Sequence, residues 1–190
     1  MKYVSIDLET TGLDPEICQI LQIGAVIADD EHPEVQLDDL PSYDMIVKHD
    51  IIQGEPYALM MNAKIIELIA KPQDIFKYIL SRNISSDFLK WCRAYIPDGK
   101  IALAGKNVAN FDLRFLRKLI CWEESEFHHR VIDPATYYRL PSDKQPPDMK
   151  LCSERAVIDM SNFTMHTALS DAKLVVELLR RGPQFVKSKV

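Results

Sequence analysis

Two acidic residues near the start of the chain have the types and the spacing of cation ligands. Asp7 and Glu9 lie in YVSIDLETTG (3–12), where apolar and polar residues alternate as in a β-strand. Successive side chains of a strand point to opposite faces, so Asp7 and Glu9 share one face, and Val4 and Ile6 share the other. An amphipathic strand with one solvated face would carry the same pattern, so the rest of the chain has to decide between these interpretations.

Two further acids lie on the apolar faces of predicted helices. Asp112 begins the apolar stripe of FDLRFLRKLI (111–120), and Asp171 lies on the stripe of HTALSDAKLVVELL (166–179). A first-turn acid such as Asp112 can also serve only to stabilise its helix. Inward carboxylates are costly without a compensating cation, and oxygen ligands suit Mg²⁺ or Mn²⁺ better than zinc. The sequence therefore predicts a site for divalent cations, most simply two of them, with four ligands: Asp7, Glu9, Asp112 and Asp171.

His166 has a position that suits a proton acceptor. It stands five residues before Asp171, at the start of the same predicted helix. An imidazole titrates near neutral pH and can take a proton from a water molecule whose pKa a metal has lowered. A histidine is more often a surface or core residue, and this is our interpretation of the other four, which are His32, His49, His128 and His129.

The elements that must position these residues follow from the periodicity along the chain. Strands are predicted at 2–9, 19–29, 43–49, 100–105 and 130–133, and helices at 57–70, 87–96 and 111–120, with two more helices after a loop at 140–148. Three consecutive strands followed by helices and then by a β-α-β-α order indicate a mixed sheet covered by helices. We therefore predict an α/β fold with a sheet of about five strands flanked by α-helices.

Length and composition limit the class of protein. The 190 residues, 47% of them apolar, are enough for a single domain over 1–190. No apolar run reaches membrane-spanning length, and the first strand starts too close to Met1 for a signal sequence, so we expect a soluble, cytoplasmic protein without a membrane partner. Four scattered cysteines fit packed thiols in a reducing compartment. The net charge of −5 disfavours nonspecific binding along a nucleic-acid duplex.

The acids and the histidine also carry a resemblance to a known family. DLETTG (7–12), NVANFD (107–112) and HTALSDA (166–172) resemble, in the same order, the three exonuclease motifs of the DEDDh 3′-to-5′ exonucleases. That group includes ribonuclease T, oligoribonuclease and polymerase proofreading subunits, and the similarity extends over about residues 3 to 180. The resemblance implies a ribonuclease H-like fold and an exonuclease domain with a family-specific helical insertion around 50–98.

The same resemblance implies a role for each of the five residues. Asp7 would bridge two Mg²⁺ or Mn²⁺ ions, while Glu9 and Asp171 would complete the first ion site. Asp112 would hold the second ion, and His166 would deprotonate the attacking water. The enzyme would then hydrolyse phosphodiester bonds at the 3′ end of single-stranded DNA or RNA and release nucleoside 5′-monophosphates.

Contacts to the terminal nucleotide are implied for a second group of residues, most of them in or near the first two motifs. These are Thr10, Thr11, Leu13, Met61, Asn62, Asn107, Asn110 and Phe111. Packing inside its own helix is the other interpretation of Met61. The second motif differs from the common family pattern at one position, since Val108 stands four residues before Asp112, where many relatives have asparagine, and Asn107 lies one residue earlier.

Two other functions are compatible with these residues. One is a metal-dependent hydrolase of free nucleotides, and the other is a noncatalytic nucleic-acid-binding module of the same fold. A noncatalytic module has no need of four acids and a histidine together, and all five are present here. The choice between DNA and RNA depends on how the site treats a 2′-hydroxyl group, and both a homodimer and an association with a polymerase are compatible with the chain.

Overall fold

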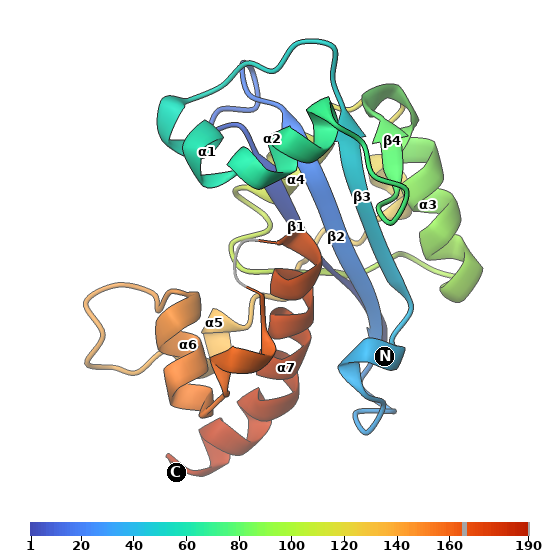
Figure 1. Cartoon of the computed structure of the whole chain (residues 1–190). Helices are drawn as coiled ribbons and strands as arrows, with labels where there is room; N and C mark the ends of the chain where they lie inside the picture. The colour runs from blue at the N-terminus through green and yellow to red at the C-terminus, as the bar shows by residue number, and fades with distance from the viewer. Residues whose placement is uncertain (165–166, 190) are drawn as a thin grey trace.

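A mixed β-sheet forms the centre of the molecule (Figure 1). The computed structural model describes residues 1–164 and 167–189, and within them the sheet has five strands in the order β4-β3-β2-β1-β5. The strands are β1 (Lys2–Thr10), β2 (Ile20–Asp29), β3 (Ser42–Lys48), β4 (Tyr78–Leu80) and β5 (Leu103–Ala104). β1, β2 and β3 form an antiparallel meander, while β5 and β4 pair in parallel with β1 and β3. The predicted α/β fold with a mixed sheet is confirmed.

Helices cover both faces of this sheet. They are α1 (Pro56–Met61), α2 (Ala63–Ala70), α3 (Ile84–Tyr95), α4 (Asp112–Leu116), α5 (Ala135–Tyr138), α6 (Met149–Ala156) and α7 (Ala168–Lys187). α7 crosses β1 and β2 on one face, where α5 and α6 pack beside it, and α3 and α4 lie on the other face (Figure 1). None of the helices in the described part of the chain has the length and apolar character needed to cross a membrane.

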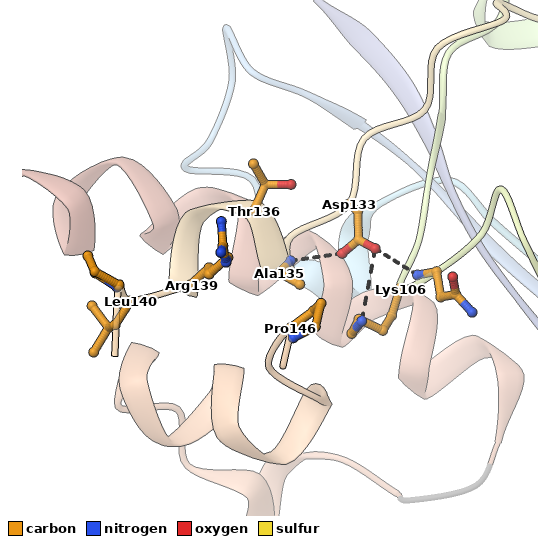
Figure 2. A pocket seen from close by; sticks show the side chains of 9 residues that line it. Lys106, Asp133, Ala135, Thr136, Arg139, Leu140 and Pro146 are labelled. Carbon is orange, nitrogen blue, oxygen red and sulfur yellow. Dashed lines mark hydrogen bonds and ion pairs between the residues drawn. The ribbon is translucent and has the colours of Figure 1, made fainter. Parts of the chain in front are cut away.

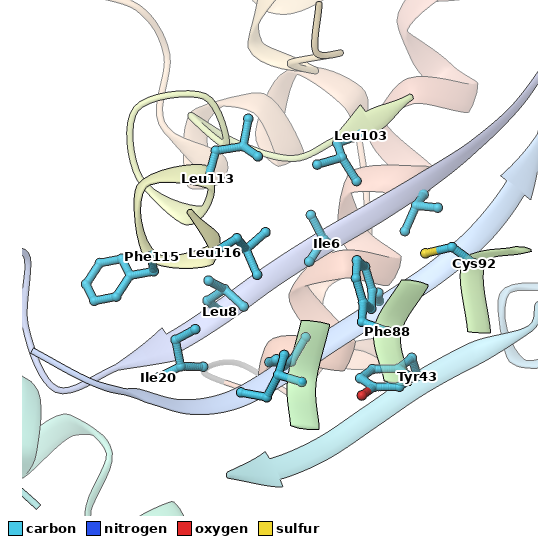
Figure 3. Packing of buried hydrophobic residues seen from close by; sticks show 14 of the residues in the cluster. Ile6, Leu8, Ile20, Tyr43, Phe88, Cys92, Leu103, Leu113, Phe115 and Leu116 are labelled. Carbon is cyan, nitrogen blue, oxygen red and sulfur yellow. The ribbon is translucent and has the colours of Figure 1, made fainter. Parts of the chain in front are cut away.

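The period-two pattern of β1 places its two sets of side chains in two different cores. Ile6 and Leu8 pack with Phe88 of α3 and Leu116 of α4, as Figure 3 shows. On the other face, Ser5 is fully buried and its hydroxyl donates a hydrogen bond of 2.8 Å to the carbonyl oxygen of Ala172 in α7. The face that carries the two acids of β1 is therefore the face covered by α7, as alternation along a strand predicts.

The strand predicted at 130–133 is wrong. Only Ile132 makes a β-bridge there, to Ala104 in β5. Pro134 follows directly and has no N–H to donate to a ladder. The carboxylate of Asp133 instead accepts hydrogen bonds from the backbone N–H groups of Asn107 and Ala135, at 2.9 and 2.8 Å. The segment therefore closes a loop next to the sheet and does not extend the sheet.

The strand β4 was not predicted, because it lies between two predicted helices, in a segment for which no strand was expected. β4 has three residues, too few to display a period of two, and it pairs in parallel with β3. The helix predicted at 57–70 is divided into α1 and α2, because Asn62 ends the first and has a non-helical backbone (φ −94°, ψ 18°). The predicted insertion at 50–98 thus contains α1, α2 and α3, and it also contributes a strand to the sheet.

Candidate active site

The two acids of β1 meet an acid from α7 at the centre of the candidate site. Asp7, Glu9 and Asp171 each offer a carboxylate oxygen, and these three oxygens lie within 4.8 Å of one another. All three side chains are half-buried. Asp171 reaches β1 because it lies in the first turn of α7, which crosses the sheet at this point. Three of the four predicted metal ligands, separated by up to 164 positions in the sequence, are therefore brought together.

The fourth predicted ligand lies against the edge of β1. Asp112 is only 3% exposed, and its Oδ1 accepts a hydrogen bond of 3.0 Å from the backbone N–H of Leu8. The short strand β5 pairs with β1 only at Val4 and Ser5, so the carboxylate takes a position on the edge that a longer β5 would have occupied. α4 presents Asp112 there from its first residue. The hydrogen bond holds the carboxylate of Asp112 at Leu8, the residue that separates Asp7 from Glu9 in the sequence.

The charges of these acids oppose one another. Burial raises the pKa of Asp7 well above its ordinary value, and the negative charges of Asp112, Asp171 and Glu9 raise it further. Burial likewise raises the pKa of Asp112 to about 7, although the N–H groups of Leu8 and of Asp112 itself favour the ionised form. Carboxylates gathered in this way require a proton or a cation, and an all-oxygen donor set fits a hard divalent cation such as Mg²⁺ or Mn²⁺.

A tight loop follows β1 and carries three of the predicted substrate contacts. The hydroxyl of Thr10 donates to the carbonyl oxygen of Gly12 at 2.7 Å, and the hydroxyl of Thr11 accepts from the N–H of Gln19 at 2.8 Å. Both threonines are buried. Their hydroxyl groups therefore hold the shape of the loop, while Leu13, which is 68% exposed, is the side chain that the loop presents to solvent.

Two residues at the ends of α1 form hydrogen bonds that stabilise this loop. The N–H of Glu55 donates to the carbonyl oxygen of Thr11 at 2.7 Å, and a carboxylate oxygen of Glu55 accepts from the N–H of Leu13 at 3.0 Å. Asn62 is 6% exposed, and its side-chain amide donates to the carbonyl oxygen of Thr10 at 3.0 Å. α1 lies between Glu55 and Asn62, so this helix and the loop after β1 form one connected unit. Met61, at the end of α1, is 39% exposed.

The loop before Asp112 turns sharply at Asn107. This residue has a left-handed backbone (φ 57°), which asparagine adopts more readily than most residues. The side-chain amide of Asn110 donates to Oδ1 of Asn107 at 3.2 Å, and the ring of Phe111 lies 5.3 Å from that of Phe115. Val108 is fully buried, so it packs inside the core and cannot replace an exposed asparagine contact.

A cavity of about 740 Å³ opens beside this loop, at the start of α5 (Figure 2). Its lining includes Lys106, Asn107, Asp133 and Arg139. The ammonium group of Lys106 lies 4.0 Å from the carboxylate of Asp133, which also accepts the N–H of Asn107 (Figure 2). The cavity thus combines two cationic side chains with backbone that leads directly to Asp112.

The structure adds residues that the sequence did not single out. Glu55 precedes a proline that starts a helix, so its sequence context indicates only a helix start. Lys106 and Arg139 lie in different segments, and nothing local indicates that they line one cavity. His166, the predicted general base, lies outside the described residues.

The chain is similar in sequence and in fold to known exonucleases. The exonuclease family model RNase T matches residues 4–179 of the chain. The oligoribonuclease of Vibrio cholerae is 28% identical over 172 residues, covering 88% of this chain and 86% of the relative. The oligoribonuclease of Wigglesworthia glossinidia brevipalpis is 30% identical over 187 residues, covering 96% of this chain and 91% of the relative.

A solved structure has a similar fold. E. coli exonuclease I in complex with a 5cy-dT13 oligonucleotide matches with a TM-score of 0.66 at 14% identity. The match covers 98% of this chain and 42% of that chain, so this chain spans about two fifths of the length of the exonuclease. At this level of identity the likeness concerns the arrangement of strands and helices.

Proposed function

The chain belongs to the RNase T family of exonucleases and is a 3′-to-5′ exonuclease; on this premise we propose that it uses divalent cations to shorten single-stranded RNA oligonucleotides. The observation that supports the cations most directly is the meeting of Asp7, Glu9 and Asp171 within 4.8 Å, with Asp112 beside them. The oligoribonucleases, which resemble the chain over 86% and 91% of their own lengths, support short RNA as the substrate.

In this proposal the acids hold two Mg²⁺ or Mn²⁺ ions. When bound, such ions neutralise charge on the phosphate and lower the pKa of the attacking water. The charges of Asp112, Asp171 and Glu9 all act on Asp7, so Asp7 would contact both ions, while Glu9 and Asp171 would complete one site and Asp112 the other. His166 would accept the proton of the attacking water, an assignment that rests on its place in the sequence.

The loop after β1 would receive the 3′ end of the strand. Glu55 and Asn62 fix the backbone of this loop, so the exposed Leu13 has a defined place in the loop that follows the acids of β1. An apolar side chain at that place can pack against the terminal base. Met61 would contact the same nucleotide, and Asn110 and Phe111 would bound the opposite side.

The cavity beside Asn107 would hold the nucleotide that precedes the scissile bond. Lys106 and Arg139 supply positive charge there for a phosphate group, and Arg139 is exposed and available to it.

We expect R139A to raise KM about 10-fold and to change kcat little, because an ionic hydrogen bond contributes about 1.5–3 kcal/mol. Steady-state kinetics on a trinucleotide measure this. K187A, at the far end of α7, removes the same charge and serves as the control, and an unchanged KM in R139A would contradict the placement.

The proposed function is tested on 5′-labelled single-stranded RNA and DNA of equal sequence, five nucleotides long. With Mg²⁺ or Mn²⁺ we expect an RNA ladder that shortens from the 3′ end, and with EDTA we expect no cleavage. Faster shortening of DNA would contradict RNA as the substrate. Hydrolysis of a nucleoside triphosphate without shortening of either strand would replace the proposal with a nucleotide hydrolase.

A further inference from the structure

The start of α7 contacts the two residues of β2 that pair with the acids of β1. In the register of β1 and β2, Asp7 faces Gly24 and Glu9 faces Gln22. A Cβ atom added to Gly24 would lie 2.0 Å from the backbone N of Leu169, in the first turn of α7. Only a residue without a side chain leaves room for such an approach. The start of α7 therefore lies directly on the backbone of β2, one strand away from Asp7.

A buried side chain fixes the same end of α7. Gln22 is 7% exposed, and its Oε1 accepts a hydrogen bond of 3.3 Å from the backbone N–H of Ala168, the first residue of the helix. The first N–H groups of a helix have no partner within it, and Ala168 is fully buried, so Gln22 supplies an acceptor that water cannot.

Asp44 on β3 fixes the orientation of this amide. The Nε2 group of Gln22 donates to Oδ1 of Asp44 at 2.7 Å. A carboxylate can only accept, so the NH₂ group of Gln22 points to Asp44 and its carbonyl oxygen points to Ala168. Asp44 is itself the register partner of Gly24. A chain of hydrogen bonds thus runs from β3 through Gln22 to the helix that carries Asp171.

We propose that Gln22 and Asp44 are positioning residues, which hold the start of α7 so that Asp171 lies beside Asp7 and Glu9. Asp171 is three residues after Ala168, within the same turn, so a shift of the helix end moves its carboxylate by a similar distance. Displacements of about 1 Å at a reacting centre can cost about 100-fold in rate. This inference rests on the proposed function for the role of Asp171 as a metal ligand.

The test reverses the direction of one hydrogen bond, the bond between positions 22 and 44. In Q22E the carboxylate at position 22 can still accept from Ala168, but it cannot donate to Asp44, and the two carboxylates repel each other. In Q22E/D44N the amide at position 44 donates to position 22, so the chain of hydrogen bonds is complete again. D44N alone keeps an acceptor for Gln22.

We expect Q22E at pH 8 to lower kcat about 10-fold and to raise the Mn²⁺ concentration for half-maximal thermal stabilisation at least about 3-fold. The double variant should recover most of both losses, and D44N should stay near the wild type. Y43F is the matched control, because it breaks a hydrogen bond of 3.0 Å to Asp87 from the neighbouring residue on the opposite face of the same strand. It should lower stability without changing the Mn²⁺ midpoint.

Different results would contradict the positioning role and the proposed function. A Q22E variant with the kinetics and the Mn²⁺ midpoint of the wild type would overturn the positioning role, as would a double variant no better than Q22E. The Mn²⁺ midpoint comes from thermal unfolding and needs no substrate. A wild type that binds Mn²⁺ but does not cleave RNA would contradict the proposed function, while the comparison of midpoints would still test the positioning role.

Discussion

Replacing Asp7 with asparagine is expected to lower kcat by at least about 10³-fold and, at the same time, to raise the melting temperature of the metal-free protein. The loss follows from the place of Asp7 among the acids, since removal of one preorganised charged contact to a reacting centre costs about 10²–10³-fold, and Asp7 would contact both ions. The gain in stability follows from the neighbours of Asp7, because burial and three nearby acids oppose its charge.

The size of the stability gain can be bounded. Asparagine has the shape of aspartate without its charge, so D7N removes the electrostatic cost and leaves the packing unchanged. A gain of about 1–2 kcal/mol, which is the size of common stabilising substitutions, corresponds to a rise of several degrees, since about 1 kcal/mol shifts the melting temperature by roughly 2–4 °C for a domain of this size. Thermal unfolding in EDTA and cleavage of the RNA pentamer provide the two measurements.

Two control variants make this result specific. D98N changes an exposed aspartate in the loop after α3 and should leave kcat and the melting temperature unchanged. H166N should lower kcat strongly and keep the thermal stabilisation by Mg²⁺, because His166 is proposed to move a proton and not to hold a metal. Cleavage by D7N within about 10-fold of the wild type, or a fall in its metal-free melting temperature, would contradict the assignment of Asp7.

The acid pair of β1 could be predicted from the sequence because it depends on a local rule. Alternation along a strand fixes that Asp7 and Glu9 share a face, whatever the strand packs against. The same holds for Asp171, whose position on the apolar stripe of a long helix indicates that it points to the sheet. The family motifs then placed these residues in one site, and the structure brings them within 4.8 Å.

Other features depend on pairings that no local pattern encodes. The hydrogen bond from Leu8 to Asp112 joins residues 104 positions apart and exists because β5 is only two residues long. β4 has three residues, so its alternation is too short to distinguish from a loop. The segment 130–133 has a strand-like pattern, but Pro134 and the side-chain hydrogen bonds of Asp133 prevent a strand from forming there.

The residues that position the acids also depend on contacts between distant parts of the sequence. Gln22 looks like an ordinary polar position in an apolar strand, and its contact with Ala168 spans 146 positions. Glu55 and Asn62 stand at the two ends of a six-residue helix, and their contacts with the loop after β1 follow only from the packing of that helix. Sequence patterns thus identified the groups that could do the chemistry, while the groups that position them required the fold.

The raised pKa values also predict how stability depends on pH. Burial holds the folded pKa of Asp112 at about 7, above its ordinary value of 3.8. Between these two pH values the folded protein keeps a proton that the unfolded chain has released, so the free energy of unfolding falls as the pH rises through this window. The fall is complete above pH 7 and amounts to the order of 4 kcal/mol for Asp112 alone. Asp7 acts in the same direction.

Divalent cations should largely remove this dependence. A bound cation compensates the ionised carboxylates, and metal affinity rises as protons leave the ligands. We therefore expect the metal-free protein to lose stability from pH 5 to pH 8, and the protein in saturating Mg²⁺ to lose little or none. Urea unfolding at four pH values, with EDTA or with Mg²⁺, measures both curves.

Two further variants locate the effect in the acid cluster. D112N removes one of the titrating groups, so its metal-free curve should be flatter than that of the wild type. D143N serves as the comparison, because the guanidinium of Arg155 lowers the pKa of Asp143 to about 2, and a group with a lowered pKa makes stability depend on pH only below its ordinary value. Its effect on stability is therefore constant between pH 5 and pH 8. Metal-free stability that rises with pH over this range in the wild type would show that the four acids are not buried together without a cation.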